Sequence, residues 1–207
     1  MKVTRDEIIA AARELFREKG YAGASMQDLA DRIGLKKASL YMRFSNKEAI
    51  VPEVLDALLH ETLTQANAGP GGGPWQVTYE NALRAIAGDL AERKRCVGLH
   101  LAYGVSEETP AATEAVQNFF ATLRAQLVSI LSSAMSPDRA EIVASDALAR
   151  IEGATLLVAV FGEKAAMERA VQACRRDADA AVRNNGQTSL IALDASSQRS
   201  ARAGADP

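Results

Sequence analysis

The sequence has few of the residues that disulfide frameworks and metal sites require. Its 207 residues include two cysteines, Cys96 and Cys174, and two histidines, His60 and His100. Neither pair has the spacing of a zinc site, and two distant cysteines do not indicate a disulfide framework. We therefore expect no bound metal and no cofactor.

Long hydrophobic runs are also missing. No stretch of 18 apolar residues occurs, and the most apolar segment, residues 154–161, is too short to cross a bilayer. The first nine residues, MKVTRDEII, contain no hydrophobic signal region. We therefore expect a cytoplasmic protein with no membrane partner.

The common sequence signatures of enzymes are absent as well. The chain has no GxSxG, no HExxH, no P-loop and no GxGxxG motif. The glycines at 71–73 lie between prolines and follow no predicted strand, which argues against a phosphate-binding loop. We predict that the protein is not an enzyme.

Charge is present but unevenly distributed. Residues 1–50 contain ten Lys/Arg against seven Asp/Glu, a net +3, whereas residues 51–207 contain fourteen against nineteen, a net −5. A basic end on an otherwise acidic protein attracts polyanions and orients them. This modest asymmetry favours a nucleic-acid partner for the N-terminal part.

Apolar residues recur at the three- and four-residue spacing of α-helices along most of the chain, so we predict an all-α fold. Thr4, Ser25 and Ser45 are each followed three positions later by an acidic residue, the pattern of a capping box. Gly20 and Gly34 are expected helix stops. The predicted helices span residues 5–19, 25–33, 36–44, 46–65, 75–90, 96–103, 112–135, 138–161 and 164–182.

Three further features interrupt this pattern. Pro52 lies inside the predicted fourth helix, where a missing N–H and a crowded turn predict a kink. The glycine- and proline-rich segment 68–74 is the first clear break between helices. Residues 184–207 are mostly small and polar, and we expect them to be disordered.

The second and third predicted helices, with a glycine between them, have the pattern of a helix-turn-helix. A motif of fixed spacing runs through them: SMQDLA at 25–30, GL at 34–35, SLY at 39–41, Phe44, and NKEA at 46–49. This motif resembles the DNA-binding domain of the TetR family of transcriptional regulators. Residues 96–103 are also similar to a stretch that opens the sixth helix in one branch of the family.

The resemblance implies a homodimer that binds a double-stranded DNA operator. Its third helices would enter successive major grooves, and a small-molecule effector would bind the second domain and change the spacing of the two reading helices. Most family members repress transcription without ligand. One position departs from the family pattern: Lys36 stands where Ser or a similar cap is frequent, so we expect weaker capping of the third helix.

Ten residues are candidates for DNA contact. Small side chains permit close approach to the duplex, while hydroxyl, amide and cationic groups donate to phosphates or base edges. The alternative is a solvated helix face with capping residues. The candidates are Ser25, Gln27, Lys36, Lys37, Ala38, Ser39, Tyr41, Met42, Arg43 and Lys47.

Five residues are candidates for a ligand cavity: Cys96, His100, Tyr103, Phe119 and Phe120. Cys96 follows three cations at 93–95, whose charges would lower the thiol pKa and favour thiolate chemistry. The alternative is that Cys96 is a small buried hydrophobe and that the other four residues belong to the core.

These observations predict a two-domain, ligand-responsive DNA-binding transcriptional regulator, a repressor that a small molecule releases from a palindromic operator. We place a helix-turn-helix DNA-binding domain at 1–47, a regulatory ligand-binding and dimerisation domain at 48–183, and a tail at 184–207. Small residues within 138–182 would let helices approach closely in a dimer. The alternative is a helical small-molecule-binding or thiol redox-sensing module without specific operator binding.

Overall fold

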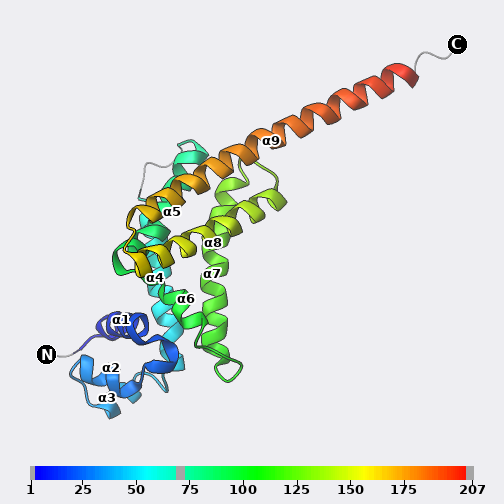
Figure 1. Ribbon diagram of the computed structural model, residues 1–207. Coiled ribbons are helices and arrows are strands. Elements are labelled where there is room, and N and C mark those ends of the chain that lie inside the picture. Colours follow the sequence, from blue (N-terminus) through cyan, green and yellow to red (C-terminus); the bar gives the residue numbers. More distant parts are fainter. Residues whose placement is uncertain (1–2, 69–72, 204–207) are drawn as a thin grey trace.

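The computed structural model describes residues 3–68 and 73–203, with side chains throughout these ranges except at residue 89 and residues 185–203. All regular secondary structure in these ranges is helical, which confirms the predicted all-α class. Figure 1 shows α1 to α3 gathered at one end of the molecule and α8 and α9 at the other. The helices are α1 (Arg5–Gly23), α2 (Met26–Arg32), α3 (Lys37–Tyr41), a 3-10 turn η1 (Glu48–Ile50), α4 (Val51–Ala66), α5 (Trp75–Arg93), α6 (Val97–Ala102), α7 (Pro110–Leu131), α8 (Pro137–Phe161) and α9 (Ala165–Ala203).

Capping boxes begin the first two helices, as predicted. The Thr4 hydroxyl accepts the Glu7 N–H at 3.2 Å, and the Glu7 carboxylate accepts the Thr4 N–H at 2.7 Å. Ser25 and Asp28 make the same reciprocal pair at α2, with both bonds at 3.0 Å. Each box satisfies amide donors that a helix start leaves unpaired.

Glycines with left-handed backbone angles shape the turns between these helices. Gly20 has φ of 66° and interrupts α1, which resumes and ends at Gly23. The predicted helix end at Gly20 is therefore a kink within α1. Gly34 has φ of 67° in the turn that follows α2. Side chains other than glycine are strained at such angles, so these two residues fix the direction of the chain.

The start of α4 differs from the sequence prediction in two ways. The side chain of Asn46, not Ser45, accepts the N–H of Ala49 at 2.8 Å, so the predicted capping box at Ser45 is wrong. Pro52 lies in the first turn of α4 and not in its interior. Proline is tolerated there because that N–H has no helical partner, so the predicted kink at Pro52 is also wrong.

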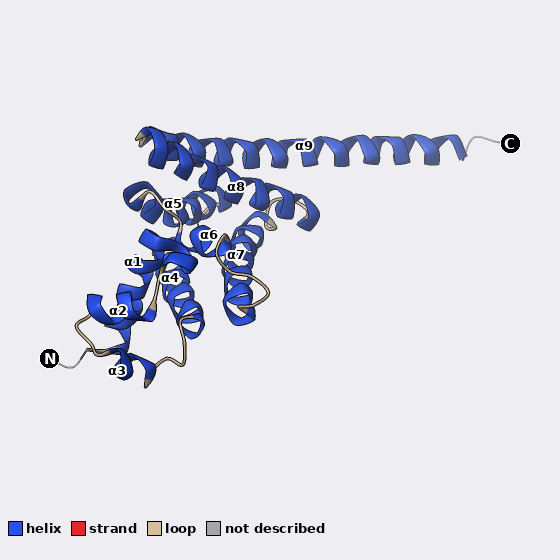
Figure 2. Cartoon of the chain, turned by 60° about the horizontal axis from the view of Figure 1, so that its bottom comes forward, coloured by secondary structure: helices blue, strands red, loops and turns tan. Residues whose placement is uncertain are grey.

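The long C-terminal helices form the opposite end of the molecule. Cys96 begins α6, which confirms the helical interpretation of residues 96–103, and α8 ends at Gly162 with φ of 70°. In Figure 2, α9 lies along α8 and projects beyond it. The sequence places the end of this helix near 182 and a disordered tail after it, whereas α9 continues to Ala203. Residues 184–203 contain no proline to stop it.

Two hydrophobic cores fill the molecule. One joins α4 and α5 to α7, α8 and α9. The other joins α1 to α4 with residues of α6 and α7, among them Leu101 and Phe119. The second core crosses the domain boundary that we predict at residue 47. Glu48 strengthens this connection, because its carboxylate accepts the N–H groups of Ala111 (2.8 Å) and Ala112 (3.3 Å) at the start of α7.

The structure tests the two remaining predicted non-helical segments only in part. Part of the glycine- and proline-rich segment 68–74 lies outside the described residues, as do the last residues of the chain, 204–207. None of the helices in the described ranges is both long and apolar enough to span a bilayer.

Candidate nucleic-acid interface and adjoining cavity

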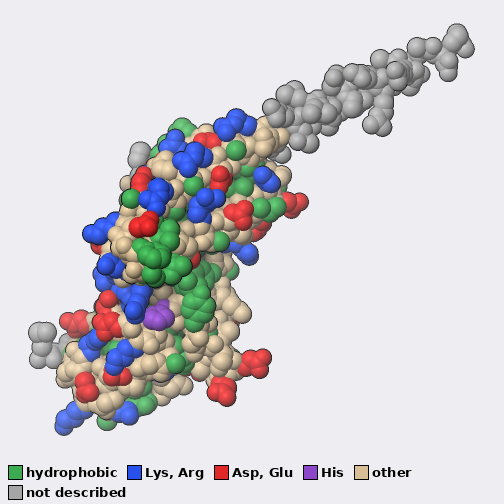
Figure 3. All heavy atoms as spheres, in the orientation of Figure 1, with side chains coloured by type: hydrophobic (Ala, Val, Ile, Leu, Met, Phe, Trp, Pro, Cys, Tyr) green, Lys and Arg blue, Asp and Glu red, His purple; other side chains and the backbone are tan. Residues whose placement is uncertain are grey.

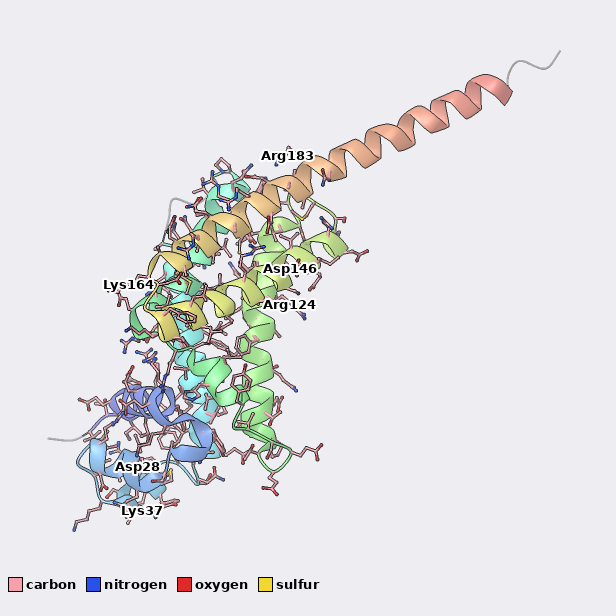
Figure 4. All side chains as sticks on the ribbon, in the orientation of Figure 1. Asp28, Lys37, Arg124, Asp146, Lys164 and Arg183 are labelled. Carbon is pink, nitrogen blue, oxygen red and sulfur yellow. The ribbon has the colours of Figure 1, made fainter. Side chains whose placement is uncertain are left out.

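The short helix α3 presents most of the predicted DNA-contacting residues on one exposed surface. Leu40 is fully buried and anchors the helix, while Tyr41 and Met42 are 44% and 88% exposed. Lys36, Lys37 and Ala38 are exposed as well. Lys36 makes no side-chain cap, as we expect from its departure from the family pattern. Figure 4 shows Lys37 at the end of the molecule, away from Lys164 and Arg183.

The α3 surface is basic and partly apolar. The Lys37 ammonium lies 5.9 Å from the centre of the Tyr41 ring, a cation–π distance that holds both side chains near each other. Ser39 is half-buried beside them. Cationic donors next to an exposed aromatic and a methionine suit phosphates, base edges and sugar surfaces.

The start of α2 presents the next two predicted contacts, Ser25 and Gln27, both of which are exposed. The Ser25 hydroxyl is engaged with Asp28 at 2.5 Å, and the Gln27 amide donates to Asp31 at 2.7 Å. Hydrogen bonds from Lys19 and Ser25 lower the pKa of Asp28 to about 2. The Ser25 hydroxyl must exchange Asp28 for a phosphate before it can donate to DNA, whereas the Gln27 amide keeps a second N–H and its oxygen for a partner.

Arg43 and Lys47 differ from the other candidates because the fold itself uses their charged ends. Arg43 donates to the backbone oxygen of Val3 at 2.7 Å. The Lys47 ammonium donates to the backbone oxygens of Tyr21 (2.5 Å) and Ala24 (2.9 Å). Burial lowers the Lys47 pKa. These contacts hold the third helix and η1 against α1, a positioning role that the sequence did not reveal.

A cavity of about 630 Å³ lies between α6 and α8, close to α1. Three of the five predicted ligand residues, Cys96, His100 and Tyr103, line it. Tyr103 is 81% exposed at its mouth. Leu99, Leu156 and Ala159 supply apolar walls. In Figure 3, hydrophobic side chains gather in the middle of one face, with a histidine and basic side chains below them.

The two phenylalanines do not line this cavity. Phe119 is buried and Phe120 half-buried, and their rings meet edge to face with centroids 5.2 Å apart. They pack against α6 at Gly98, where an added Cβ would lie 2.7 Å from the Phe119 ring. The prediction that they contact a ligand is therefore not supported by their positions, because close helix packing occupies the space between them and α6.

Cys96 is buried within the cavity wall and caps α6, with its sulfur accepting the Leu99 N–H at 3.4 Å. Burial and the neighbouring Glu152 carboxylate raise the pKa of the Cys96 thiol well above its usual value. The expectation that nearby cations lower this pKa is wrong. Arg93 and Arg95 instead reach α1, where they contact Glu14 and the backbone oxygens of Arg17 and Glu18.

With these geometries established, comparison with known proteins is informative. Residues 8–54 match the family model described as "Bacterial regulatory proteins, tetR family". The match covers α1, α2, α3, η1 and the first turn of α4. Residues 8–54 thus match the N-terminal domain of the TetR family. The resemblance carried by residues 25–49 is thereby confirmed.

Curated relatives match the chain over limited segments. It is 29% identical over 105 residues to the uncharacterized HTH-type transcriptional regulator YuxN of Bacillus subtilis, covering 50% of this chain and 36% of the relative. It is 48% identical over 46 residues to IcaR of Staphylococcus epidermidis, named as a negative transcriptional regulator of a biofilm operon, covering 22% and 25%. The chain thus spans between a quarter and about a third of these relatives' lengths.

The whole helical architecture has similar solved structures. A TetR transcriptional regulator from Legionella pneumophila superimposes with a TM-score of 0.75, covering 86% of this chain and 98% of that one at 21% identity. At this identity the likeness shows the fold, including a helix-turn-helix domain followed by a helical domain.

The sequence analysis did not identify Glu152, the acidic residue of the cavity. Glu152 lines the cavity, and its Oε2 is buried without a hydrogen-bond partner. Burial raises the pKa of this carboxyl group. The signal was present as an acidic residue two positions before the apolar run at 154–161.

Proposed function

We propose that the chain is a DNA-binding transcriptional regulator that represses its target until a small molecule binds. The exposed surface of α3 carries this proposal. Lys36, Lys37, Tyr41 and Met42 project from a helix that Leu40 anchors in the core. A family match over residues 8–54 and a relative named as a negative regulator support the same function.

DNA selection tests this function and identifies the operator together. The purified full-length protein is incubated with random duplexes, and bound fragments are sequenced. One reading helix per chain is too small for a specific site, so we expect a pseudo-palindrome with half-sites about 34–36 Å apart or a small multiple of this. Enrichment of no sequence would refute specific operator binding and favour a ligand-binding module without an operator.

Matched lysine variants test which end of the molecule binds DNA. Lys37→Ala removes a cation from α3, whereas Lys164→Ala removes one from the exposed loop between α8 and α9. We expect Lys37→Ala to weaken operator binding by ~1–3 kcal/mol if it contacts guanine. Lys164→Ala should leave it unchanged. Equal losses in both variants would show that binding follows net charge and not the α3 surface.

The partners proposed for this function include a second copy of the chain. Four large apolar side chains of α8 are exposed, between 53% and 67%: Ile142, Leu156, Val160 and Phe161. Apolar exposure on this scale marks an interaction surface. Val160→Asp should shift the sedimentation coefficient from dimer to monomer, while Val77→Asp, at an apolar residue 47% exposed on α5, should not. A monomeric unmodified protein would exclude this part of the proposal.

The cavity between α6 and α8 supports the small-molecule part of the proposal. Its wall contacts the DNA-binding domain directly, because His100 Nδ1 lies 3.1 Å from the backbone oxygen of Arg17. A thiol redox sensor has less support, since Cys96 and Cys174 are both buried with raised pKa values. A thiol sensor would lose operator binding on treatment with hydrogen peroxide, and we expect no such loss.

A further inference from the structure

The cavity between α6 and α8 contains a carboxylate without a compensating charge. Glu152 Oε2 is buried and has no hydrogen-bond partner, and the Cys96 thiol is the side chain that bonds to this carboxyl group. A buried acceptor that remains unpaired costs the full desolvation of that oxygen. Native proteins retain few such groups, and a water, an ion, a ligand or a functional use accounts for them.

Lys94 is exposed at the edge of the cavity, and two other polar groups of its wall are engaged elsewhere. The Thr155 hydroxyl donates to the backbone oxygen of Ile151 at 3.1 Å. Arg95 is exposed at the rim and donates to the backbone oxygen of Glu18 at 2.9 Å. No cation contributes to the pKa of Glu152, which is raised because burial outweighs the bond from Cys96. The interior of the cavity therefore offers an unpaired acceptor oxygen, while its rim is basic.

The remaining wall is apolar and sets the shape of an occupant. Leu99 is half-buried on α6, and Leu156 is 60% exposed on α8. Tyr103 presents an aromatic ring that is 81% exposed at the mouth. Aromatic and aliphatic surfaces of this kind bind flat or branched apolar bodies, and an aromatic face also attracts organic cations.

We propose that this cavity binds an organic ammonium ion with an apolar body, whose N–H group donates to Glu152. A small rotation of the carboxylate presents Oε2 to the ligand, and the apolar body lies against Leu99 and Leu156. The proposal rests on the regulatory function proposed above only for its effect on DNA. The binding itself depends on this cavity alone.

An occupant of this cavity contacts the elements that hold α1. His100 lines the cavity and reaches the backbone oxygen of Arg17, and an added Cβ at Gly20 would lie 3.2 Å from His100 Nε2. Arg95 reaches the same turn of α1. A ligand that moves α6 therefore changes the support of the kink at Gly20, from which α2 and α3 follow.

Isothermal titration with three probes of one shape tests the ligand class. The probes are 1-naphthylmethylamine, 1-naphthylmethanol and 1-naphthoate, which are cationic, neutral and anionic at pH 7. A charge-assisted hydrogen bond gives roughly tenfold to hundredfold in affinity. We expect the amine to bind that much more tightly than the alcohol, and the naphthoate to bind most weakly. Preference for the naphthoate, or no binding of the amine, would overturn the proposal.

Two glutamate variants test whether Glu152 binds the ammonium group of the amine. Glu152→Gln should reduce the affinity for the amine to that for the alcohol, with binding of the alcohol retained as evidence of an intact cavity. Glu141→Gln changes an exposed residue of the same helix and should leave the preference for the amine unchanged. An amine preference that survives Glu152→Gln would refute the role of this residue.

Operator binding separates this proposal from the proposed function. The amine should weaken operator binding of the unmodified protein about 5–150-fold, the usual range of coupling between sites, and should not affect Glu152→Gln. If the protein binds no operator but binds the amine through Glu152, the ligand proposal stands and the regulatory function fails. If it binds an operator but not the amine, operator binding stands and the ligand proposal fails.

Discussion

The capping bonds that begin α1 and α2 and the ion pairs that join the helices of the C-terminal bundle span very different distances along the chain. At the starts of α1 and α2, the capping boxes join residues three positions apart. In the bundle, Arg150 bonds to Asp177 across 27 positions and Arg175 to Glu80 across 95. The starts of α1 and α2 are therefore set by neighbouring residues, whereas the packing of the bundle helices depends on contacts between distant parts of the chain.

Buried side-chain atoms without a hydrogen-bond partner occur at both ends, because Arg13 Nε lies in α1 and two oxygen atoms lie in the bundle. Glu152 Oε2 and the Tyr79 hydroxyl are buried there without hydrogen-bond partners. Burial raises the Tyr79 pKa, as it raises that of Glu152. Unpaired polar groups reduce stability and are retained where function uses them. The two acidic groups of the bundle therefore reduce its stability.

The largest expected effect tests the close packing of α6. Gly98→Ala would place a methyl group 2.7 Å from the Phe119 ring, so we expect the free energy of unfolding to fall by about 1–3 kcal/mol. Gly88→Ala on α5 is the matched control, because nothing lies within 4 Å of its added Cβ. That variant should be neutral or stabilised by up to ~1 kcal/mol. Chemical denaturation measures both, and equal changes would contradict the packing argument.

Glu152→Gln should stabilise the protein while it removes ligand recognition. Because the folded-state pKa of Glu152 is raised, the ionised carboxylate destabilises the fold above its unfolded pKa. The gain should be about 1–2 kcal/mol at pH 7 and should vanish as pH falls below the unfolded pKa, where both states are protonated. Urea titrations at pH 7 and pH 4 measure it. A loss of stability at pH 7 would mean that Glu152 has a structural partner.

The local caps of the reading end should have intermediate effects. Ser25→Ala removes the acceptor for the Asp28 N–H and should lower the free energy of unfolding by ~1 kcal/mol. The Asp28 pKa is depressed to about 2, so its contribution is complete above the unfolded pKa and is lost as pH falls toward 2. Asp28→Asn should reduce the fall in the free energy of unfolding as the pH is lowered toward 2. If the free energy of unfolding still falls equally at low pH in this variant, Asp28 is not the source of the fall.

Pro52→Ala should have the smallest effect. Pro52 occupies the first turn of α4, so its replacement removes no distortion and only increases the entropy of the unfolded chain. We expect a loss of ~0.4–1 kcal/mol and an unchanged response to effector. Operator affinity is measured with and without effector in both proteins. An altered ratio would show that Pro52 takes part in the response to effector.

Local sequence signals predicted much of the fold because they act over one helical turn. Thr4 and Ser25 cap the helices they precede, and Gly34 turns the chain after α2. The errors also came from local reasoning applied where a distant group decides. Ser45 appeared to pair with Glu48, but Glu48 caps α7 from more than sixty positions away.

The candidate DNA surface was foreseen more completely than the cavity. The α3 residues follow from a contiguous motif, and the structure exposes them together. Arg43 and Lys47 share that motif, yet their charged ends contact backbone oxygens of Val3, Tyr21 and Ala24. Exposure and hydrogen-bond partners are properties of the folded chain, so the motif could not distinguish these two residues from Lys37.

The sequence by itself determined the helical class, the helix-turn-helix and its family, because periodicity, caps and turn glycines act through neighbouring residues. Only the tertiary structure decided which side chains surround the cavity. It brought Glu152 of α8 beside Cys96 of α6, and it placed Phe119 behind Gly98. Those arrangements depend on how separate helices pack, and the free energy of packing depends on surfaces that no single segment contains.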